Sequence, residues 1–202
     1  MSTIKTVCVY CGSGPGTNPR FTEGAKAFGK ALAENNIRLV YGGGSLGLMG
    51  SVATSVLDHG GTVTGIIPDF LRMRENALTR VQEMIVTPDM HERKRLMFEH
   101  SDGFVALPGG VGTLEELVEQ LTWKQLGRHA KPVLLANIDN FWEPLFSLLS
   151  HMRQRSSSAP ASRSTSSRPN ASRTSCLGCA PPRLARWTAR SSSHRKWRGD
   201  SS

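Results

Sequence analysis

The residues with the clearest chemical meaning lie in the segment Pro108 to Glu116, which reads Pro-Gly-Gly-Val-Gly-Thr-Leu-Glu-Glu. Glycines have no Cβ, so backbone N–H groups in such a segment approach an anion closely, and the positive end of a helix dipole favours phosphate there. The segment therefore predicts a phosphate site beside a carboxylate. A second interpretation stays open, because Thr113 and Glu116 also have the spacing of a capping box, in which the glutamate only satisfies an N–H group at the helix start.

A second glycine loop, Gly42 to Gly47, has the Gly-x-Gly-x-x-Gly spacing of a dinucleotide-binding fingerprint. In that interpretation Asp69, which ends the next strand, binds a ribose hydroxyl and the chain binds NAD. The NAD interpretation leaves the first glycine loop unexplained, whereas two glycine loops on neighbouring strand ends suit one mononucleotide held from both sides. From this loop geometry we add Ser13, Gly43 and Gly44 to the predicted site.

Two cations lie on the predicted helix that begins at Met90. Spacings of three, four and seven residues place Met90, Arg93, Lys94 and Met97 on one stripe, so the face that should meet the sheet carries both cations. Buried cations need anionic partners, and substrate phosphate or Glu116 is the expected partner here. The alternative is a basic face in contact with solvent, in which the aliphatic parts of the side chains pack on the protein and the charged ends reach water.

Short apolar, β-branched runs alternate with amphipathic stretches along the chain. The expected strands are Thr6 to Cys11, Arg38 to Tyr41, Thr62 to Ile67, Gly103 to Leu107 and Pro132 to Ala136. The expected helices are Phe21 to Glu34, Leu48 to His59, Met90 to Ser101, Thr113 to Leu126 and Phe141 to Met152. This alternation predicts an α/β, Rossmann-like three-layer sandwich, in which a parallel sheet is covered by helices on both faces. Ligands bind outside the carboxyl ends of the strands in such sheets, and both glycine loops fall at that edge.

The pattern stops near residue 152, which divides the chain into a domain of residues 1–152 and a basic tail of residues 153–202. The first part has 14 Lys and Arg against 15 Asp and Glu, whereas the tail has 11 against one and lacks Val, Ile, Phe and Tyr. Such a segment cannot bury enough apolar surface to offset its chain entropy, so we expect disorder. It is interpreted either as an out-of-frame product of GC-rich codons or as a tail that binds nucleic acid through Arg, Trp187 and Trp197.

Composition also bears on location and metals. No apolar run approaches the roughly 20 residues that span a bilayer, and the N-terminus lacks the features of a signal peptide, so we expect a cytoplasmic protein without a membrane partner. Cys8/Cys11 and Cys176/Cys179 have the C-x-x-C spacing of zinc and redox sites. We expect no metal, because Cys8 lies in a predicted buried strand, where cysteine acts as a small apolar residue.

Three ordered motifs resemble the signature of the LONELY GUY family. They are Gly-Gly-Gly-x-x-Gly-Leu-Met-Gly at Gly42 to Gly50, Met-His-Glu-Arg-Lys at Met90 to Lys94, and Pro-Gly-Gly-x-Gly-Thr-x-x-Glu at Pro108 to Glu116. The likeness extends to Thr122-Trp123-x-Gln125-Leu126-Gly127 and covers nearly all of residues 1–152. It implies hydrolysis of the N-glycosidic bond in N6-substituted adenosine 5′-monophosphates, AMP being a further candidate substrate, with release of the free base and ribose 5-phosphate.

The resemblance also implies roles for individual residues. By position, Arg93 and Glu116 match the catalytic pair. The substrate-binding positions of the family are matched by Glu75, Lys94, Gly110, Val111, Gly112, Thr113, Leu114, Glu115 and Thr122. The resemblance further implies a homodimer or larger homo-oligomer with its sites near the subunit interface, and no metal or organic cofactor. The basic tail replaces the last strand and helix of the family, so it is expected to weaken assembly.

The chemistry of the reaction fits the catalytic pair. Cleavage at C1′ passes through an oxocarbenium-like species, so a carboxylate beside the ribose, here Glu116, stabilises positive charge and orients the attacking water. Arg93 is expected to keep Glu116 ionised, since a neighbouring cation lowers the pKa of a carboxyl group. Family members are often labelled lysine decarboxylases, but no lysine here stands in a recognisable pyridoxal phosphate context. The alternative from a different functional class is a nucleotide-binding module without catalysis.

Overall fold

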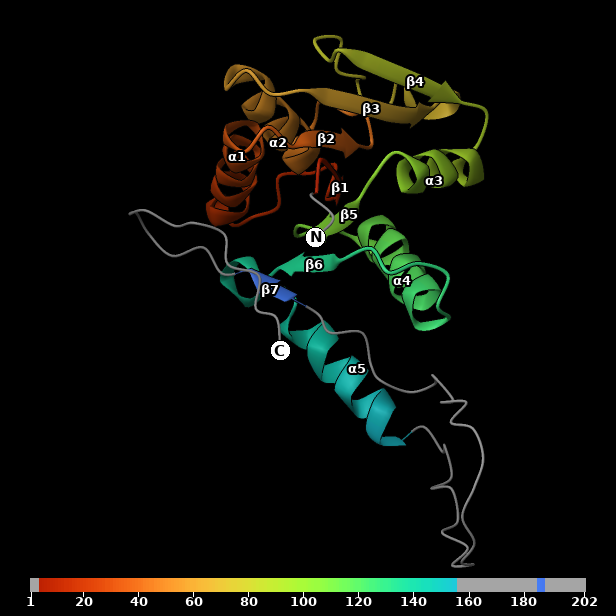
Figure 1. Cartoon of the computed structure of the whole chain (residues 1–202). Coiled ribbons are helices and arrows are strands. Elements are labelled where there is room, and N and C mark those ends of the chain that lie inside the picture. Colours follow the sequence, from red (N-terminus) through yellow and green to blue (C-terminus); the bar gives the residue numbers. More distant parts are fainter. Residues whose placement is uncertain (1–3, 156–184, 188–202) are drawn as a thin grey trace, which may run out of the picture.

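The structure, a computed structural model, describes residues 4–155 and 185–187, and in this part of the chain seven parallel strands form one sheet (Figure 1). The order across the sheet is β4-β3-β2-β1-β5-β6-β7. The strands are β1 (Thr6–Tyr10), β2 (Arg38–Tyr41), β3 (Val63–Pro68), β4 (Glu83–Thr87), β5 (Gly103–Ala106), β6 (Val133–Ala136) and β7 (Ala185–Trp187). All five predicted strands are present, because apolar, β-branched runs suit a parallel sheet that is covered on both faces.

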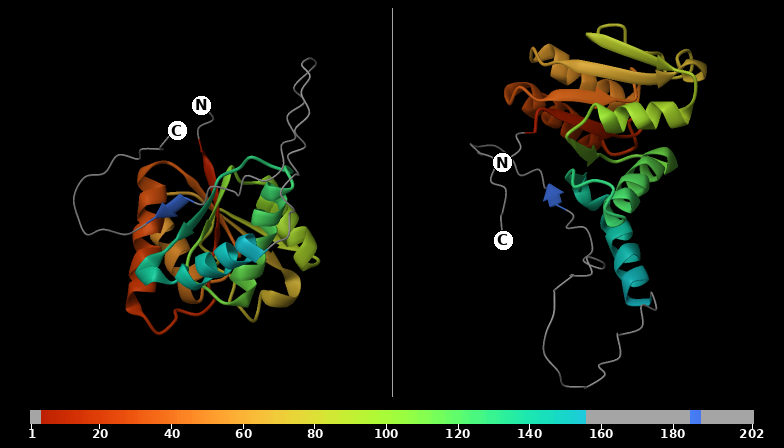
Figure 2. Two further views of the ribbon diagram at one scale, coloured as in Figure 1. Left: turned by 90° about the horizontal axis from the view of Figure 1, so that it is seen from below. Right: turned by 45° about the vertical axis from the view of Figure 1, so that its right-hand side comes forward.

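Helices cover both faces of the sheet, which confirms the predicted three-layer α/β sandwich (Figure 2). The helices are α1 (Pro19–Glu34), α2 (Gly47–Asp58), α3 (Met90–Glu99), α4 (Val111–Gln125) and α5 (Glu143–Arg155), with the short 3-10 helices η1 (Asp69–Leu71) and η2 (Ile138–Asn140). One core cluster joins the sheet to α1 and α2 through side chains such as Phe28 and Val52. The other joins the sheet to α3, α4 and α5 through Met97, Leu117 and Leu145.

Strand β4 differs from the prediction, in which residues 83–87 belong to no strand. It lies at the outer edge of the sheet and pairs only with β3. Glu83 and Val86 are exposed, so the segment lacks the run of fully buried residues by which the other strands are recognised. An edge strand has a neighbour on one side only, and its sequence carries a correspondingly weaker signal.

The chain after residue 152 also departs from the prediction at two points. Helix α5 continues to Arg155, and Ala185–Trp187 form β7, which pairs in parallel with β6 at the edge that was expected to lack a strand. The predicted disorder of the rest of the tail, the pair Cys176/Cys179 and the predicted nucleic-acid contact of Trp197 lie outside the described residues.

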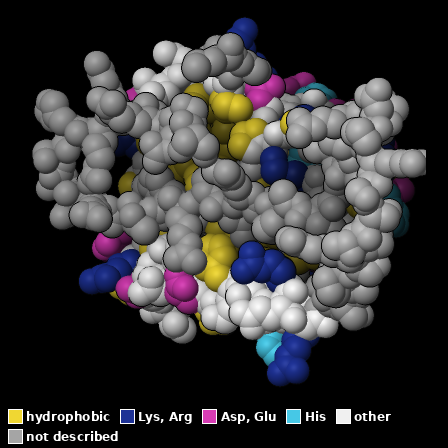
Figure 3. All heavy atoms as spheres, turned by 60° about the horizontal axis from the view of Figure 1, so that its bottom comes forward, with side chains coloured by type: hydrophobic (Ala, Val, Ile, Leu, Met, Phe, Trp, Pro, Cys, Tyr) yellow, Lys and Arg dark blue, Asp and Glu magenta, His cyan; other side chains and the backbone are white. Residues whose placement is uncertain are grey.

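Hydrophobic side chains are visible on the face of the molecule that Figure 3 shows. Leu148 and Met152 of α5 are exposed in the described part of the chain.

Cys8 and Cys11 are buried, free thiols. Among residues 4–155 and 185–187, no helix has the length and apolar character needed to cross a membrane.

The glycine loops meet at the carboxyl edge of the sheet, as predicted. Beyond β1, the N–H of Gly12 donates to the carbonyl of Pro108, which follows β5, at 3.1 Å. The carbonyl of Gly12 in turn accepts the N–H of Leu48, in the first turn of α2, at 3.1 Å. Backbone bonds therefore tie the loops after β1, β2 and β5 into one rim.

Candidate active site

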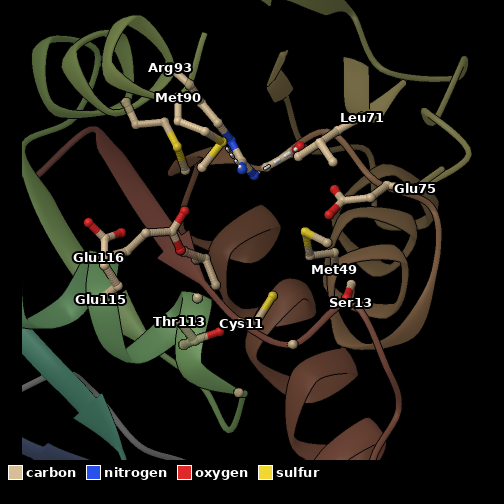
Figure 4. Close-up of a pocket in the computed structure, with 16 residues that line it drawn as sticks. Cys11, Ser13, Met49, Leu71, Glu75, Met90, Arg93, Thr113, Glu115 and Glu116 are labelled. Atoms are coloured by element: carbon tan, nitrogen blue, oxygen red, sulfur yellow. Dashed lines mark hydrogen bonds between the residues drawn. The ribbon is translucent and has the colours of Figure 1, made fainter. Parts of the chain in front are cut away.

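A cavity of about 270 Å³ opens at this rim, between α3, α4 and the segment after β3 (Figure 4). Its wall has a polar part and an apolar part. The polar and glycine residues of the wall are Gly12, Ser13, Gly42, Glu75, Arg93, Gly110, Gly112, Thr113, Glu115 and Glu116, and the apolar ones are Val9, Cys11, Met49, Leu71, Met90 and Met97. The two glycine loops and both residues of the expected catalytic pair thus share one cavity.

Helix α4 begins beside the cavity, with Gly110 as its N-cap and Val111 as its first helical residue. The interpretation of Thr113 and Glu116 as a capping box is therefore wrong, because Thr113 lies in the first turn and Glu116 in the second. The first N–H groups of a helix have no partner within the helix, and Gly110 and Gly112 have open space where a Cβ would stand. This arrangement leaves the helix start free to receive an anion.

Glu116 lies at the cavity with only 9% of its surface exposed. Burial raises the pKa of its carboxyl group from 4.5 to about 7, while Arg93 and Lys94 lower it and the neighbouring charges of Glu115 and Glu75 raise it. The expectation that Arg93 keeps Glu116 ionised is thus only half correct. The cation acts in the expected direction, but desolvation outweighs it.

Arg93 is 6% exposed, so the interpretation of a solvated basic face is wrong for this residue. Its guanidinium is held by backbone carbonyls: Nε donates to Ile66 at 3.2 Å and Nη2 donates to Gly42 at 3.3 Å. Nη1 lies 3.6 Å from the sulfur of Met90. No carboxylate of the described residues forms an ion pair with Arg93, so its charge remains available to an anionic ligand in the cavity.

Gly42 lines the cavity but is not among the predicted site residues. Its carbonyl accepts from Arg93, and a Cβ at this position would overlap the guanidinium of Arg93 and approach the sulfur of Met49. The signal was present in the triple glycine that follows β2. Loop geometry alone favoured Gly43 and Gly44 over Gly42, because it does not reveal which backbone carbonyl a distant arginine approaches.

Lys94 lies beside the cavity but does not line it. Its Nζ donates to Glu115 at 2.5 Å and to Glu119 at 3.1 Å, and only 12% of its side chain is exposed. Glu119 was not among the predicted residues, since its spacing from Lys94 along the chain carries no signal. The pair of carboxylates fixes the ammonium group at the edge of the site.

The predicted residues fall into two groups. Those that line the cavity are Ser13, Glu75, Arg93, Gly110, Gly112, Thr113, Glu115 and Glu116. Those that do not line it are Gly43, Gly44, Lys94, Val111, Leu114 and Thr122. Gly43 and Gly44 instead hold the segment after β3, because the Gly43 carbonyl accepts from Leu78 at 3.0 Å and Gly44 forms a β-bridge with Ala77.

Thr122 lies far along α4, on its exposed face, where its hydroxyl donates to the carbonyl of Val118 at 2.8 Å. Asp69, the acid of the NAD interpretation, does not line the cavity and pairs with Arg72 at 3.2 Å on the surface. The cavity of one chain therefore combines a helix start that is open to an anion with a buried carboxylate one turn further along.

The raised pKa of Glu116 predicts a penalty in stability. The folded protein binds the proton of this carboxyl group more tightly than the unfolded chain does. Proton binding therefore stabilises the fold fully below pH 4.5, and this stabilisation is lost as the pH rises through about 7. Glu116→Gln should match the parent near pH 4.5 and exceed its unfolding free energy by about 3 kcal/mol at pH 8. Urea unfolding of both proteins across this pH range measures the difference, and a difference that does not grow with pH would contradict the burial argument.

Known proteins resemble this chain in sequence. Residues 49–173 match the protein-family model described as "Possible lysine decarboxylase". A cytokinin riboside 5′-monophosphate phosphoribohydrolase from Rhodococcoides fascians is 47% identical over 163 residues, which make up 80% of this chain and 82% of that protein. A protein with the same enzyme name from Arabidopsis thaliana is 46% identical over 162 residues, 80% of this chain and 75% of its own length.

Solved structures share the fold. The molybdenum cofactor binding protein from the phototrophic bacterium Rippkaea orientalis aligns with a TM-score of 0.59 and 26% identity, over 75% of this chain and 87% of that one. The DNA processing protein A from Helicobacter pylori aligns with a TM-score of 0.53 and 14% identity, which shows a shared fold alone.

Proposed function

Because the chain belongs to the LONELY GUY family, whose members include the cytokinin riboside 5′-monophosphate phosphoribohydrolases, we propose that the cavity at the start of α4 is its active site. The reaction is hydrolysis of the N-glycosidic bond of cytokinin nucleotides, with release of the free base and ribose 5-phosphate. The assignment of the site rests on the Glu116 carboxyl group, which is buried and lines the same cavity as the free helix start and Arg93.

In this proposal the 5′-phosphate occupies the start of α4. The phosphate is attracted by the helix dipole and by the N–H groups around Gly110 to Thr113. The positive charge of Arg93 lies across the cavity from them. The ribose then lies over Glu116, one turn along the helix. As the bond from C1′ to the base lengthens, the base takes the electron pair of that bond and the carboxylate of Glu116 stabilises the positive charge on the ribose. Water attacks C1′ and gives a proton to Glu116, and the departing base gains a proton, so that the elements of water are divided between ribose and base.

The description of the matched family model as a possible lysine decarboxylase finds no support in the cavity. Decarboxylation through pyridoxal phosphate requires a lysine that forms a Schiff base at the site. Among the described residues that line the cavity there is no lysine, and the nearby Lys94 is engaged by Glu115 and Glu119. The side chains present suit an anionic sugar phosphate and a base instead.

Release of free base from N6-isopentenyladenosine 5′-monophosphate, followed by chromatography, tests the proposal. The full chain should release the base from this nucleotide, and it should act much more slowly on the same nucleoside without its phosphate, because the helix start then has no anion to bind. Absence of base release by folded protein that binds the nucleotide would favour a binding module without catalysis.

We further propose that the protein acts as a homodimer through α4. Exposed apolar residues recur along one face of this helix, at Val111 (83% exposed), Leu114, Val118 and Leu126 (74% exposed). An apolar stripe of this kind marks a contact surface, and Thr122 lies on the exposed surface of the same helix. A second copy seated there would bring Thr122 of one subunit toward a site, as its match to a substrate-binding position implies.

Val118→Asp should convert the dimer into monomers, because a carboxylate buried in the contact would lose its hydration without a partner. Light scattering after size exclusion measures the mass. Val86→Asp, at an exposed position on the edge strand β4, is the matched control and should leave the mass unchanged. A parent that is monomeric at micromolar concentration, or a Val118→Asp variant that remains dimeric, would count against this interface.

Cytoplasmic location is part of the same proposal. Cys8 and Cys11 are free thiols in the described structure, as is usual in a reducing compartment.

A further inference from the structure

The Glu75 carboxylate lies across the cavity from Thr113 and Glu116 and is turned toward the open space (Figure 4). Its Oε2 is buried and has no hydrogen-bond partner among the described residues. A buried acceptor that is left unpaired is costly, and native structures usually satisfy such atoms. The atom therefore indicates a hydrogen-bond donor on the ligand.

Backbone bonds hold Glu75 in place. Its N–H donates to the carbonyl of Leu71 at 2.9 Å, and its carbonyl accepts from the N–H of Ser45 at 3.2 Å. The bridge between Gly44 and Ala77 ties the same segment to the loop after β2. The backbone that carries the Glu75 carboxylate is thus tied to the loop after β2.

The surroundings of Glu75 suit the flat base of a nucleotide. Met49 and Leu71 line the wall beside it and present apolar surface to the cavity. The phosphate and ribose are assigned to the opposite side, at the start of α4 and over Glu116. A nucleotide laid across the cavity in this direction brings the edge of its base to Glu75.

We propose that Glu75 determines which bases are accepted, by accepting a hydrogen bond from the exocyclic N6–H of the purine. An ionised carboxylate can only accept hydrogen bonds. A 6-aminopurine with one or two N–H groups supplies the donor, whereas a 6-oxopurine presents a carbonyl oxygen and a dialkylated 6-aminopurine presents no N–H. The inference rests on the proposed function, and it narrows the substrate class to purine nucleotides with at least one hydrogen on N6.

The charges around Glu75 agree with this role. Burial raises the pKa of its carboxyl group above the usual value of 4.5, and Arg93 on α3 and Arg74 on its own segment lower it. Glu116 on α4 faces it across the cavity and the two carboxyl groups repel one another when both are ionised. A base that covers Glu75 removes further water from it. A ligand without a hydrogen-bond donor therefore leaves the carboxylate with neither water nor a hydrogen-bond partner.

Rates of base release from three nucleotides test the inference: N6-isopentenyladenosine, N6,N6-dimethyladenosine and inosine 5′-monophosphates. For the full chain, kcat/KM for the first should exceed kcat/KM for each of the other two by about 10- to 100-fold. Glu75→Gln should reduce that preference to a few-fold, because an amide both donates and accepts and carries no charge. Asp69→Asn, in the same segment but outside the cavity, is the control and should keep the full preference.

The outcomes separate the two proposals. A parent that releases no base from any of the nucleotides would refute the proposed function. A parent that cleaves all three at similar rates, or a Glu75→Gln variant that keeps the full preference, would overturn the role of Glu75 while leaving the function intact. If the parent cleaves N6-isopentenyladenosine 5′-monophosphate faster than its 2′-deoxyribose form, and Glu75→Gln loses only that preference, the carboxylate holds the sugar and the inference about the base is wrong.

Discussion

Replacement of Glu116 by alanine should lower kcat for base release by about 10²- to 10⁴-fold, with a much smaller change in KM. The phosphate and base contacts that dominate binding of the ground state remain in the variant. The variant lacks the Glu116 carboxylate, which stabilises the positive charge that develops on the ribose and accepts the proton of the attacking water. Initial rates with N6-isopentenyladenosine 5′-monophosphate, measured over a range of substrate concentrations, separate kcat from KM.

Two further variants sharpen this result. Glu116→Gln keeps the size of the side chain but cannot become a carboxylate, so it should be as inactive as the alanine variant. Glu23→Ala removes an exposed carboxylate on α1, away from the cavity, and should retain the activity of the parent. A Glu116→Gln variant with nearly full kcat would rule out the assigned role of the carboxylate.

Replacement of Arg93 by lysine should lower both activity and stability, although the charge is kept. The planar guanidinium donates to the carbonyls of Ile66 and Gly42 simultaneously. The ammonium group of lysine is a single point charge and does not have two donor nitrogens in this planar arrangement. Buried carbonyls left without donors cost about 1–3 kcal/mol each, so the unfolding free energy should fall by about 2–4 kcal/mol. We expect kcat/KM to fall by about 100-fold or more, because the remaining charge no longer points at the substrate.

Gly42→Ala tests the same arrangement without touching the arginine. The added methyl group would overlap the guanidinium, so the arginine must move while its charge and length stay unchanged. Unfolding in urea and initial rates should show loss of activity in both variants. Arg93→Lys with the stability of the parent, or Gly42→Ala with its full activity, would show that the two carbonyls do not position the guanidinium.

Local sequence patterns predict most of the elements, because a buried parallel strand and an amphipathic helix each leave a characteristic periodicity. The same patterns locate the ends of the elements less closely. Thr113 was expected to begin α4, whereas the helix begins at Val111 with Gly110 as its cap. Serine and threonine are favoured as caps, but a glycine also satisfies the backbone geometry there. β4 was missed because an edge strand is only partly buried.

The family, the sandwich fold and the glycine loops at the carboxyl edge can be predicted from the amino-acid sequence, because they depend on residue types and on spacings within single segments. The electrostatics of the cavity cannot be predicted in this way. The burial that raises the pKa of Glu116 above the lowering effect of Arg93, and the carbonyl of Gly42 that holds Arg93 from 51 positions away, arise from segments that meet only in the fold. Desolvation and pairing depend on everything that surrounds a group in space, and a linear motif records only its neighbours along the chain.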